Sequence, residues 1–223
     1  MTLKLYCFGE SGHSYKAALA LELARLDWEP VFVDFFAGET RAAAYRETVN
    51  EMGEAPVLVD AGGLRLSQSG VIQQVVTELS GRFGGETPDE AREVLRWVLW
   101  DNHKLSSIAG MVRFQMNFLP EEKRDPAVIA FLQGRLQAAL QILESHLAGR
   151  DWIVGRGPTN ADLTCAGYLY YPEPFGFDRQ AHPAIHDWLG RLSQLPGWKH
   201  PYDLMTPAHP EVRKIYQKEA VSK

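Results

Sequence analysis

The chain has 223 residues and a formal net charge of −5, a length that allows one or two domains with a buried core. Acidic and basic residues are mixed along it, so no basic surface for nucleic-acid phosphates is expected. The N-terminus lacks the apolar region of a secretion signal, and the sequence contains no run of about 18 apolar residues that could span a membrane. Cys7 and Cys165 match no metal-ligand spacing. We therefore expect a cytoplasmic protein without a bound metal, and with neither nucleic acid nor membrane as a partner.

The first third of the chain predicts alternating strands and helices. Residues 3–8 and 31–35 read as short strands, and residues 14–24 between them form an Ala- and Leu-rich helix. This βαβ order implies a parallel pair with a right-handed crossover. After an irregular stretch, residues 57–59 and 64–66 flank a glycine turn and predict a β-hairpin, followed by a helix over residues 69–80. This is the order of a small thiol-handling α/β domain.

The remainder of the chain has helical periodicity. The Gly-rich segment 82–88 is the predicted linker between a first domain, residues 1–81, and an all-helical domain, residues 89–223. We expect helices over residues 89–118, 126–147 and 183–194, and a charged helix or loose end over residues 211–223. The second of these helices carries an apolar stripe: Leu132, Leu136, Leu140, Leu143 and Leu147.

A capping box precedes one further helix. In the run 159–162, Thr-Asn-Ala-Asp, the Thr159 hydroxyl is expected to accept one orphan N–H, and the Asp162 carboxylate is expected to reach back to another. This run predicts a helix start near residue 160.

The segment 53–72 reads as a device for holding a small peptide. Pro56 has no N–H and restricts Ala55 to extended conformations, so it fits the start of a strand, where it can also form a cis bend. Val57 would offer its N–H and C=O to an extended ligand as to another strand. Gln68 and Ser69 open a helix, whose first N–H groups suit a carboxylate, and the Gln68 amide suits a neighbouring amine.

The loop before the first helix lacks the sulfurs of a redox site. Residues 11–14, Ser-Gly-His-Ser, lie where a thioredoxin-like domain carries Cys-x-x-Cys, so dithiol exchange within the chain is excluded. A hydroxyl there can instead stabilise the thiolate of a ligand. Lowering a thiol pKa of about 8.5 by about two units requires roughly 2.7 kcal/mol. A hydroxyl that donates a hydrogen bond to the thiolate contributes about 1.5–3 kcal/mol, and the positive end of the helix dipole can supply the remainder. Ser11 is the leading catalytic candidate. Ser14 is either a helix N-cap or a catalytic group, and His13 has a possible role in thiol handling.

Together these motifs resemble the cytosolic glutathione transferases, in a bacterial form, over nearly the whole chain. The resemblance implies a thioredoxin-like α/β domain followed by an all-α domain, usually in a homodimer. Glutathione would be the cosubstrate, with no other cofactor, and a small hydrophobic electrophile would lie against the second domain. By this resemblance Val57, after Pro56, pairs with the cysteinyl part, Gln68 and Ser69 bind the γ-glutamyl end, and the Ser11 hydroxyl activates the thiol.

The subclass is indicated only in part. Segment 11–16, Ser-Gly-His-Ser-Tyr-Lys, aligns without gaps to the Ser-Ser-Cys-Ser-Trp-Arg run of the zeta (maleylacetoacetate isomerase) class, but Gly12 and His13 depart from it. His13 lies near the position at which beta-class bacterial transferases carry a cysteine. The first motif is therefore closest to the zeta class without matching it.

Glu54 departs from the family pattern. Many relatives place Lys or Gln beside the proline to meet the glycine carboxylate of glutathione, and a glutamate there would repel it. Either Glu54 points away, or another group holds the glycine end. His103 lies on the first long helix where the zeta class has a Gln or His that contacts ligand, so His103 or Lys104 would neutralise that end.

Three functions stay open at this stage. The leading one is a detoxifying transferase that adds the glutathione thiolate to an electrophile. A glutathione-dependent disulfide or peroxide reductase or an isomerase is the second, and a non-catalytic glutathione or ligand carrier is the third. Tyr168, Tyr170 and Tyr171 either line the electrophile pocket or pack around nearby prolines, and the buried-type Cys165 is expected in the core.

Overall fold

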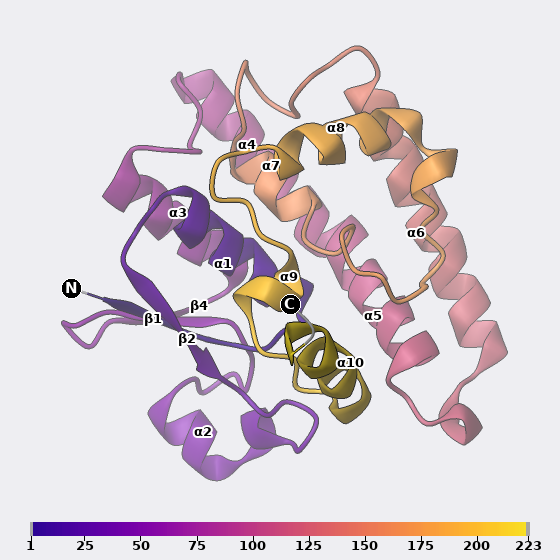
Figure 1. The fold of residues 1–223 in the computed structure, drawn as a ribbon. Helices are drawn as coiled ribbons and strands as arrows, with labels where there is room; N and C mark the ends of the chain where they lie inside the picture. The colour runs from indigo at the N-terminus through magenta and orange to yellow at the C-terminus, as the bar shows by residue number, and fades with distance from the viewer. Residues whose placement is uncertain (1, 222–223) are drawn as a thin grey trace. The chain divides into compact units, whose positions relative to one another are not determined.

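A computed structural model describes residues 2–221 and the side chains of residues 2–216 (Figure 1). The chain divides into two compact units, Met1–Ser80 with Lys199–Lys223, and Gly81–Trp198. The division after residue 80 lies next to the expected end of the first domain. The segment 199–223, which the sequence assigned to the helical domain, groups with the first unit.

The first unit is built on a four-stranded sheet in the order β2-β1-β3-β4. Strand β1 (Leu3–Cys7) pairs in parallel with β2 (Trp28–Phe32) and antiparallel with β3 (Val57–Val59), which pairs antiparallel with β4 (Arg65–Ser67). Helices α1 (Gly12–Leu23) and α3 (Ser69–Ser80) pack side by side (Figure 1). The βαβ-then-ββα order is confirmed, and with it the thioredoxin-like class of this unit.

Strand β2 begins three residues earlier than the sequence predicts. Pro30 lies inside it, in register with Leu5, which an edge strand tolerates because its outer N–H groups need no partner. The stretch 36–56, predicted to be irregular, contains a 3₁₀ turn η1 (Glu39–Arg41) and a short helix α2 (Ala43–Thr48).

The C-terminal segment is attached to the first unit by specific bonds. It holds α9 (Pro201–Leu204) and α10 (Pro210–Val221), and residues 222–223 of the predicted tail lie outside the described part. The Gly9 N–H donates to Thr206 O at 2.8 Å, and the Tyr15 hydroxyl donates to Lys199 O at 2.9 Å. A Cβ on Gly9 would lie 3.0 Å from the Pro207 backbone, so a larger residue at this position would force that backbone to shift.

The second unit is helical, as predicted. Helix α4 (Pro88–Trp100), a π-helical segment η2 (Asp101–Leu105) and α5 (Ser106–Asn117) form one run where a single helix was expected. The fully buried Asp101 accepts hydrogen bonds from Ser106 Oγ at 2.7 Å and Thr164 Oγ1 at 2.9 Å within this unit. Helix α6 (Pro126–Leu147) has the predicted bounds, and its leucine stripe is buried. The unit also contains η3 (Glu121–Lys123), η4 (Arg179–Ala181) and α8 (Pro183–Ser193).

The capping box at α7 (Asn160–Cys165) is confirmed. The Thr159 hydroxyl accepts the Ala161 N–H at 3.3 Å, and the Asp162 carboxylate accepts the Thr159 N–H at 2.8 Å. The same carboxylate accepts the Ile153 N–H and the Trp188 Nε1–H, each at 2.9 Å. One buried carboxylate therefore joins the start of α7 to the preceding loop and to α8.

Candidate active site

Ser11 is the N-cap of α1. Its backbone is extended (φ −84°, ψ 109°), and its Oγ accepts the Ser14 N–H at 3.1 Å. Because that oxygen acts as acceptor to the helix, the hydroxyl proton is left to donate to another group. Within the described residues, no partner accepts the Gly12 N–H at the same helix end. The start of α1 thus offers a hydroxyl donor, a backbone donor and the positive end of the helix dipole.

Ser14 occupies a different position from the one predicted for a cap. It is the third residue of α1, is fully buried, and its hydroxyl has no hydrogen-bond partner among the described residues. A hydroxyl with no exposed surface does not reach a ligand sulfur. This position excludes Ser14 as the N-cap, a role that Ser11 has, and argues against Ser14 as activator. The activating role of Ser11 stays a prediction.

His13 is held as a neutral imidazole. Lys16 Nζ lies 3.5 Å from His13 Nδ1, and an ammonium can only donate, so Nδ1 is the acceptor and the ring proton sits on Nε2. Burial, and secondly the Lys16 charge, lower the pKa of His13 from 6.5 to about 3. At neutral pH His13 is therefore no cationic partner for a thiolate. In this tautomer its ring proton is on Nε2.

Neither cysteine is a candidate nucleophile. Cys7 lies on β1 with 2% of its surface exposed, and burial raises the pKa of its thiol to about 12. Cys165 is 1% exposed, in the core of the second unit as predicted. Any reactive thiolate at the α1 N-terminus must therefore come from a ligand.

Pro56 stands at the start of β3, with a cis peptide bond between Ala55 and Pro56. Val57, the predicted partner of an extended ligand, is in register with Tyr6 on β1 and with Ser67 on β4. Both sides of Val57 in the plane of the sheet are thus occupied by strands of the chain itself. This pairing argues against a ligand bound to the Val57 backbone.

Ala55 has the open backbone that Val57 lacks. No hydrogen bond among the described residues occupies its N–H or C=O. Its side chain packs against the cluster formed by Phe8, Val33, Tyr45 and Ala208. The preceding carbonyl, that of Glu54, accepts hydrogen bonds from the Tyr45 hydroxyl and from Asn50 Nδ2, each at 3.0 Å. The segment is therefore held in place with one residue ready for an extended partner.

Gln68 and Ser69 lie at the start of α3, as predicted. Gln68 has a left-handed backbone (φ +68°), and its C=O accepts the N–H groups of Val71 and Ile72 at 3.0 Å each. Ser69 is the first helical residue and is buried. The N–H groups of Ser69 and Gly70 donate to no acceptor among the described residues. These donors are what a carboxylate needs.

Two charged side chains lie near the segment 53–56. The Glu54 carboxylate accepts a hydrogen bond from Gln68 Nε2 at 2.9 Å, so it points toward the α3 start. Arg46, on α2, lies against Gly53, since a Cβ on that glycine would be 3.0 Å from the Arg46 Nε. Sequence reasoning missed Arg46 because α2 was not predicted. The Gly53–Pro56 motif gave no indication of a cation 7 residues upstream of Gly53.

His103 and Lys104 are exposed on η2 in the second unit. Nothing in that unit contradicts the role predicted for them, which stays a prediction. Tyr168, Tyr170 and Tyr171, predicted either to line the electrophile pocket or to pack, all make contacts within the second unit, and the Tyr168 and Tyr171 ring centroids lie 6.0 Å apart. Tyr171 stacks on the buried Arg113 guanidinium at 3.9 Å, and the Tyr170 hydroxyl donates to Leu189 O at 2.7 Å.

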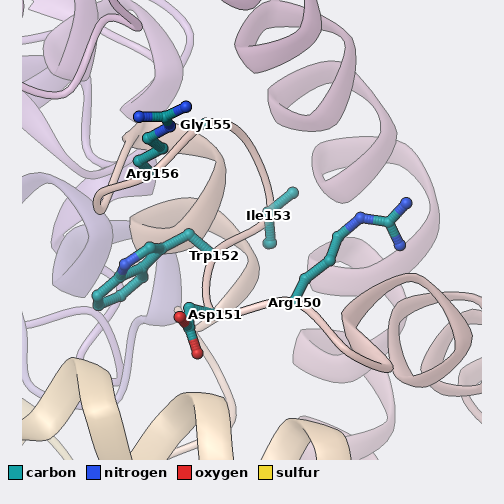
Figure 2. A pocket seen from close by; sticks show the side chains of 6 residues that line it. All are labelled: Arg150, Asp151, Trp152, Ile153, Gly155 and Arg156. Atoms are coloured by element: carbon teal, nitrogen blue, oxygen red, sulfur yellow. The ribbon is translucent and has the colours of Figure 1, made fainter.

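A cavity of about 320 Å³ lies on the loop between α6 and α7 (Figure 2). It is lined by Arg150, Asp151, Trp152, Ile153, Gly155 and Arg156. Figure 2 shows Arg150 and Trp152 extending in opposite directions, and Arg150 donates to the His146 carbonyl at 2.5 Å. The cavity contains none of the predicted site residues, and its arginines do not converge on one point.

Two absences concern residues 2–221. None of their helices combines the length and hydropathy that crossing a bilayer requires. No three His, Cys, Asp or Glu side chains of this range form a group suited to a metal ion.

Comparison with known proteins decides the family. Residues 1–78 match the model for the glutathione S-transferase N-terminal domain, and residues 109–196 match that for the C-terminal domain. A solved glutathione S-transferase from Xanthobacter autotrophicus Py2 is 30% identical, with a TM-score of 0.82, and the alignment covers 90% of this chain and 98% of that one. The chain belongs to the glutathione S-transferase family. The α/β-plus-all-α fold expected from the sequence is thereby confirmed.

Named relatives within this transferase family differ in activity. The disulfide-bond oxidoreductase YfcG of Escherichia coli (strain K12) is 26% identical over 85% of this chain and 89% of its own length. The maleylacetoacetate isomerase of Pseudomonas aeruginosa is 26% identical, and the alignment covers 93% of this chain and 99% of the isomerase. The family therefore fixes the fold and the link to glutathione chemistry, and leaves the reaction to be argued from the site.

Proposed function

We propose that the chain is a glutathione transferase: it binds glutathione on its first unit, stabilises the thiolate and adds it to an electrophilic small molecule. The observation that carries this proposal is the α1 N-terminus. There the Ser11 oxygen is occupied by the Ser14 N–H, while its proton remains available to a sulfur. The Gly12 N–H and the α1 dipole favour negative charge at the same place.

The chemical steps follow from these donors. Glutathione loses its S–H proton to water, and the sulfur anion accepts a hydrogen bond from the Ser11 hydroxyl. One such bond to a charged group contributes about 1.5–3 kcal/mol, equivalent to about one to two units of thiol pKa. The thiolate then attacks the electrophilic carbon and a C–S bond forms. In a substitution the leaving group departs with its electron pair; in an addition the neighbouring atom takes that pair and then a proton.

The rest of glutathione has candidate partners on the same unit. The Ala55 backbone, kept extended before Pro56, suits the cysteinyl N–H and C=O. Gln68 and Ser69 suit the γ-glutamyl end. Arg46 on α2 is a cation beside Gly53, and we assign it to the glycine carboxylate.

The family resemblance also supports a homodimer, a cytoplasmic location and a role in detoxification. All three are proposals. Sedimentation of the purified chain tests the first, with a mass near 50 kDa, twice the 25.1 kDa of the chain, as the expected result.

The test compares serine variants in the addition of glutathione to chlorodinitrobenzene. Ser11→Ala should lower kcat/KM about 10- to 150-fold, as loss of one donor to a charged sulfur predicts, and should raise the apparent pKa of the pH–rate profile. Ser11→Thr should retain most of the rate, because it keeps both cap and hydroxyl. Ser14→Ala is the matched control and should leave kcat unchanged. Full kcat in Ser11→Ala would remove Ser11 from the mechanism.

A second function, glutathione-dependent disulfide reduction, is favoured by the similarity to YfcG. In this reaction the glutathione thiolate attacks a disulfide sulfur, and the displaced thiolate takes a proton. Turnover of a small disulfide with little addition to chlorodinitrobenzene would support it. Isomerisation, the activity named for the P. aeruginosa relative, would show as conversion of a cis to a trans double bond without consumption of glutathione.

A non-catalytic carrier is the third possibility. Retention on immobilised glutathione with no turnover in any of these assays would support that reading. Failure to bind glutathione at all would contradict every function proposed here.

A further inference from the structure

Glu54 forms a hydrogen bond with a second exposed side chain. Its carboxylate accepts a hydrogen bond from Gln68 Nε2 at 2.9 Å, and both side chains are exposed. Bonds between exposed polar groups replace bonds to water and add little to stability. A function in ligand binding is therefore a better account of this pair than a structural one.

Both side chains extend from backbone that is held in place. The Glu54 carbonyl accepts from the hydroxyl of the buried Tyr45 and from Asn50 Nδ2. Gln68 is held by its C=O, which accepts two N–H groups of the first turn of α3. The backbone at both residues is thus fixed before a ligand arrives, which lowers the entropy cost of binding.

The direction of the Gln68 amide matters for what this pair can bind. Because its Nε2 donates to Glu54, its Oε1 remains an acceptor, next to the carboxylate, which is also only an acceptor. Two neighbouring acceptors, one of them negatively charged, suit a group with several donors and a positive charge. An ammonium has three N–H donors and no acceptor.

We infer that Glu54, with the Gln68 carbonyl oxygen, binds the α-ammonium group of the γ-glutamyl residue of glutathione. This inference rests on the proposed function, in which Gln68 and Ser69 lie at that end of the ligand. The γ-glutamyl end carries an α-carboxylate and an α-ammonium on one carbon. The Ser69 and Gly70 N–H groups suit the first, and Glu54 suits the second.

This assignment resolves the conflict noted in the sequence. A glutamate at this position would repel the glycine carboxylate if it faced that end. In the structure the Glu54 carboxylate is turned to Gln68, while the nearby cation, Arg46, lies against Gly53. Glu54 thereby selects for a free α-amine, a specificity that the transferase reaction itself does not require.

The test compares two ligands and three proteins by calorimetry. The ligands are glutathione and glutaryl-cysteinyl-glycine, which lacks only the α-amine. Wild type should bind glutathione at least about tenfold more tightly than the deamino analogue. Glu54→Gln keeps the size and a bond to Gln68 but removes the charge, and should reduce this ratio to below about threefold by weakening glutathione alone. Glu51→Gln, an exposed charge in the adjacent turn, is the matched control and should keep the wild-type ratio.

The outcomes separate the inference from the function on which it rests. Equal binding of both ligands by wild type, or an equal loss for both in Glu54→Gln, overturns the role of Glu54 while leaving glutathione binding intact. Absence of glutathione binding by wild type contradicts the proposed function itself. An unchanged urea midpoint in Glu54→Gln shows that the comparison is made on folded protein.

Discussion

The Glu10 carboxylate accepts the His209 backbone N–H at 2.8 Å, across almost the whole length of the chain. Its other oxygen accepts the Ala208 N–H, also at 2.8 Å, and Glu10 is only 4% exposed. These N–H groups immediately precede α10, so a residue next to Ser11 caps the last helix. The loop that carries Ser11 is therefore joined by hydrogen bonds to the C-terminal segment.

Removal of this carboxylate should destabilise the first unit. In Glu10→Ala the buried N–H of Ala208 and the part-buried N–H of His209 lose their acceptor, and the start of α10 loses a favourable charge. We therefore expect a loss of about 1–3 kcal/mol in the free energy of unfolding. Glu10→Gln keeps one acceptor oxygen and should lose less. Urea unfolding measures both, and hydrogen exchange should show faster exchange at the Arg213 N–H, which donates to His209 O.

Glu47→Ala is the control for this series. Glu47 is an exposed glutamate on α2, and its removal should change stability by no more than about 0.5 kcal/mol. Equal stability of Glu10→Ala and Glu47→Ala would show that the contact to α10 contributes nothing.

The sequence predicted the elements whose signals are local. The bounds of helix α6 were predicted correctly because its starting proline, the glycine after its end and its leucine stripe are all local signals. The start of α7 was predicted because the capping box Thr159–Asp162 contains both of the residues that form its hydrogen bonds. The predicted strand 31–35 begins directly after Pro30, whereas β2 contains Pro30, which is tolerated because β2 lies at the sheet edge. Helix α2 has six residues, too few to show a period.

The candidate site was predicted less completely, because part of it depends on contacts distant in sequence. Motifs correctly placed Ser11, Gln68 and Ser69 at helix starts, while their roles in binding and activation stay predictions. Val57 was named as the backbone partner and Ala55 was missed, because the pairing of Val57 with β1 and β4 is not specified by the local motif. The direction of Glu54 is likewise set by a partner 14 residues away.

The neutral state of His13 predicts a pH effect on stability. Its folded-state pKa of about 3 lies below its ordinary value of 6.5, so between these values the unfolded chain binds more protons than the folded one. Stability should therefore fall as the pH drops below about 6.5, with a slope from this group of up to about 1.4 kcal/mol per pH unit. Urea unfolding at about pH 5 and pH 7.5 should show this loss in wild type and a smaller one in His13→Asn.

Lys16→Met is the informative companion to that variant. It removes a charge that lowers the pKa of His13, so this pKa should rise toward 6.5. The loss of stability on acidification should then end at a higher pH and be smaller in total than in wild type. Identical pH dependence in wild type and His13→Asn would mean that His13 titrates normally.

The buried carboxylate of Asp162 should be among the most sensitive positions of the second unit. It accepts hydrogen bonds from Ile153, Thr159 and Trp188, and Asp162→Ala leaves these donors without an acceptor. We expect a loss of about 3–5 kcal/mol in the free energy of unfolding. The exposed Asp187→Ala on α8 is the control, and a comparable loss in both variants would contradict this account.

The left-handed backbone of Gln68 predicts a gain in stability at the expense of binding. A non-glycine residue at φ +68° is strained, so Gln68→Gly should raise the free energy of unfolding by about 0.5–1 kcal/mol. The same change removes the amide from the γ-glutamyl site, and glutathione affinity should fall about tenfold or more. Arg25→Gly is a matched control, because Arg25 has φ +57° and is exposed at the end of α1. It should gain stability in the same way without loss of affinity, whereas unchanged affinity in Gln68→Gly would remove Gln68 from the proposed site.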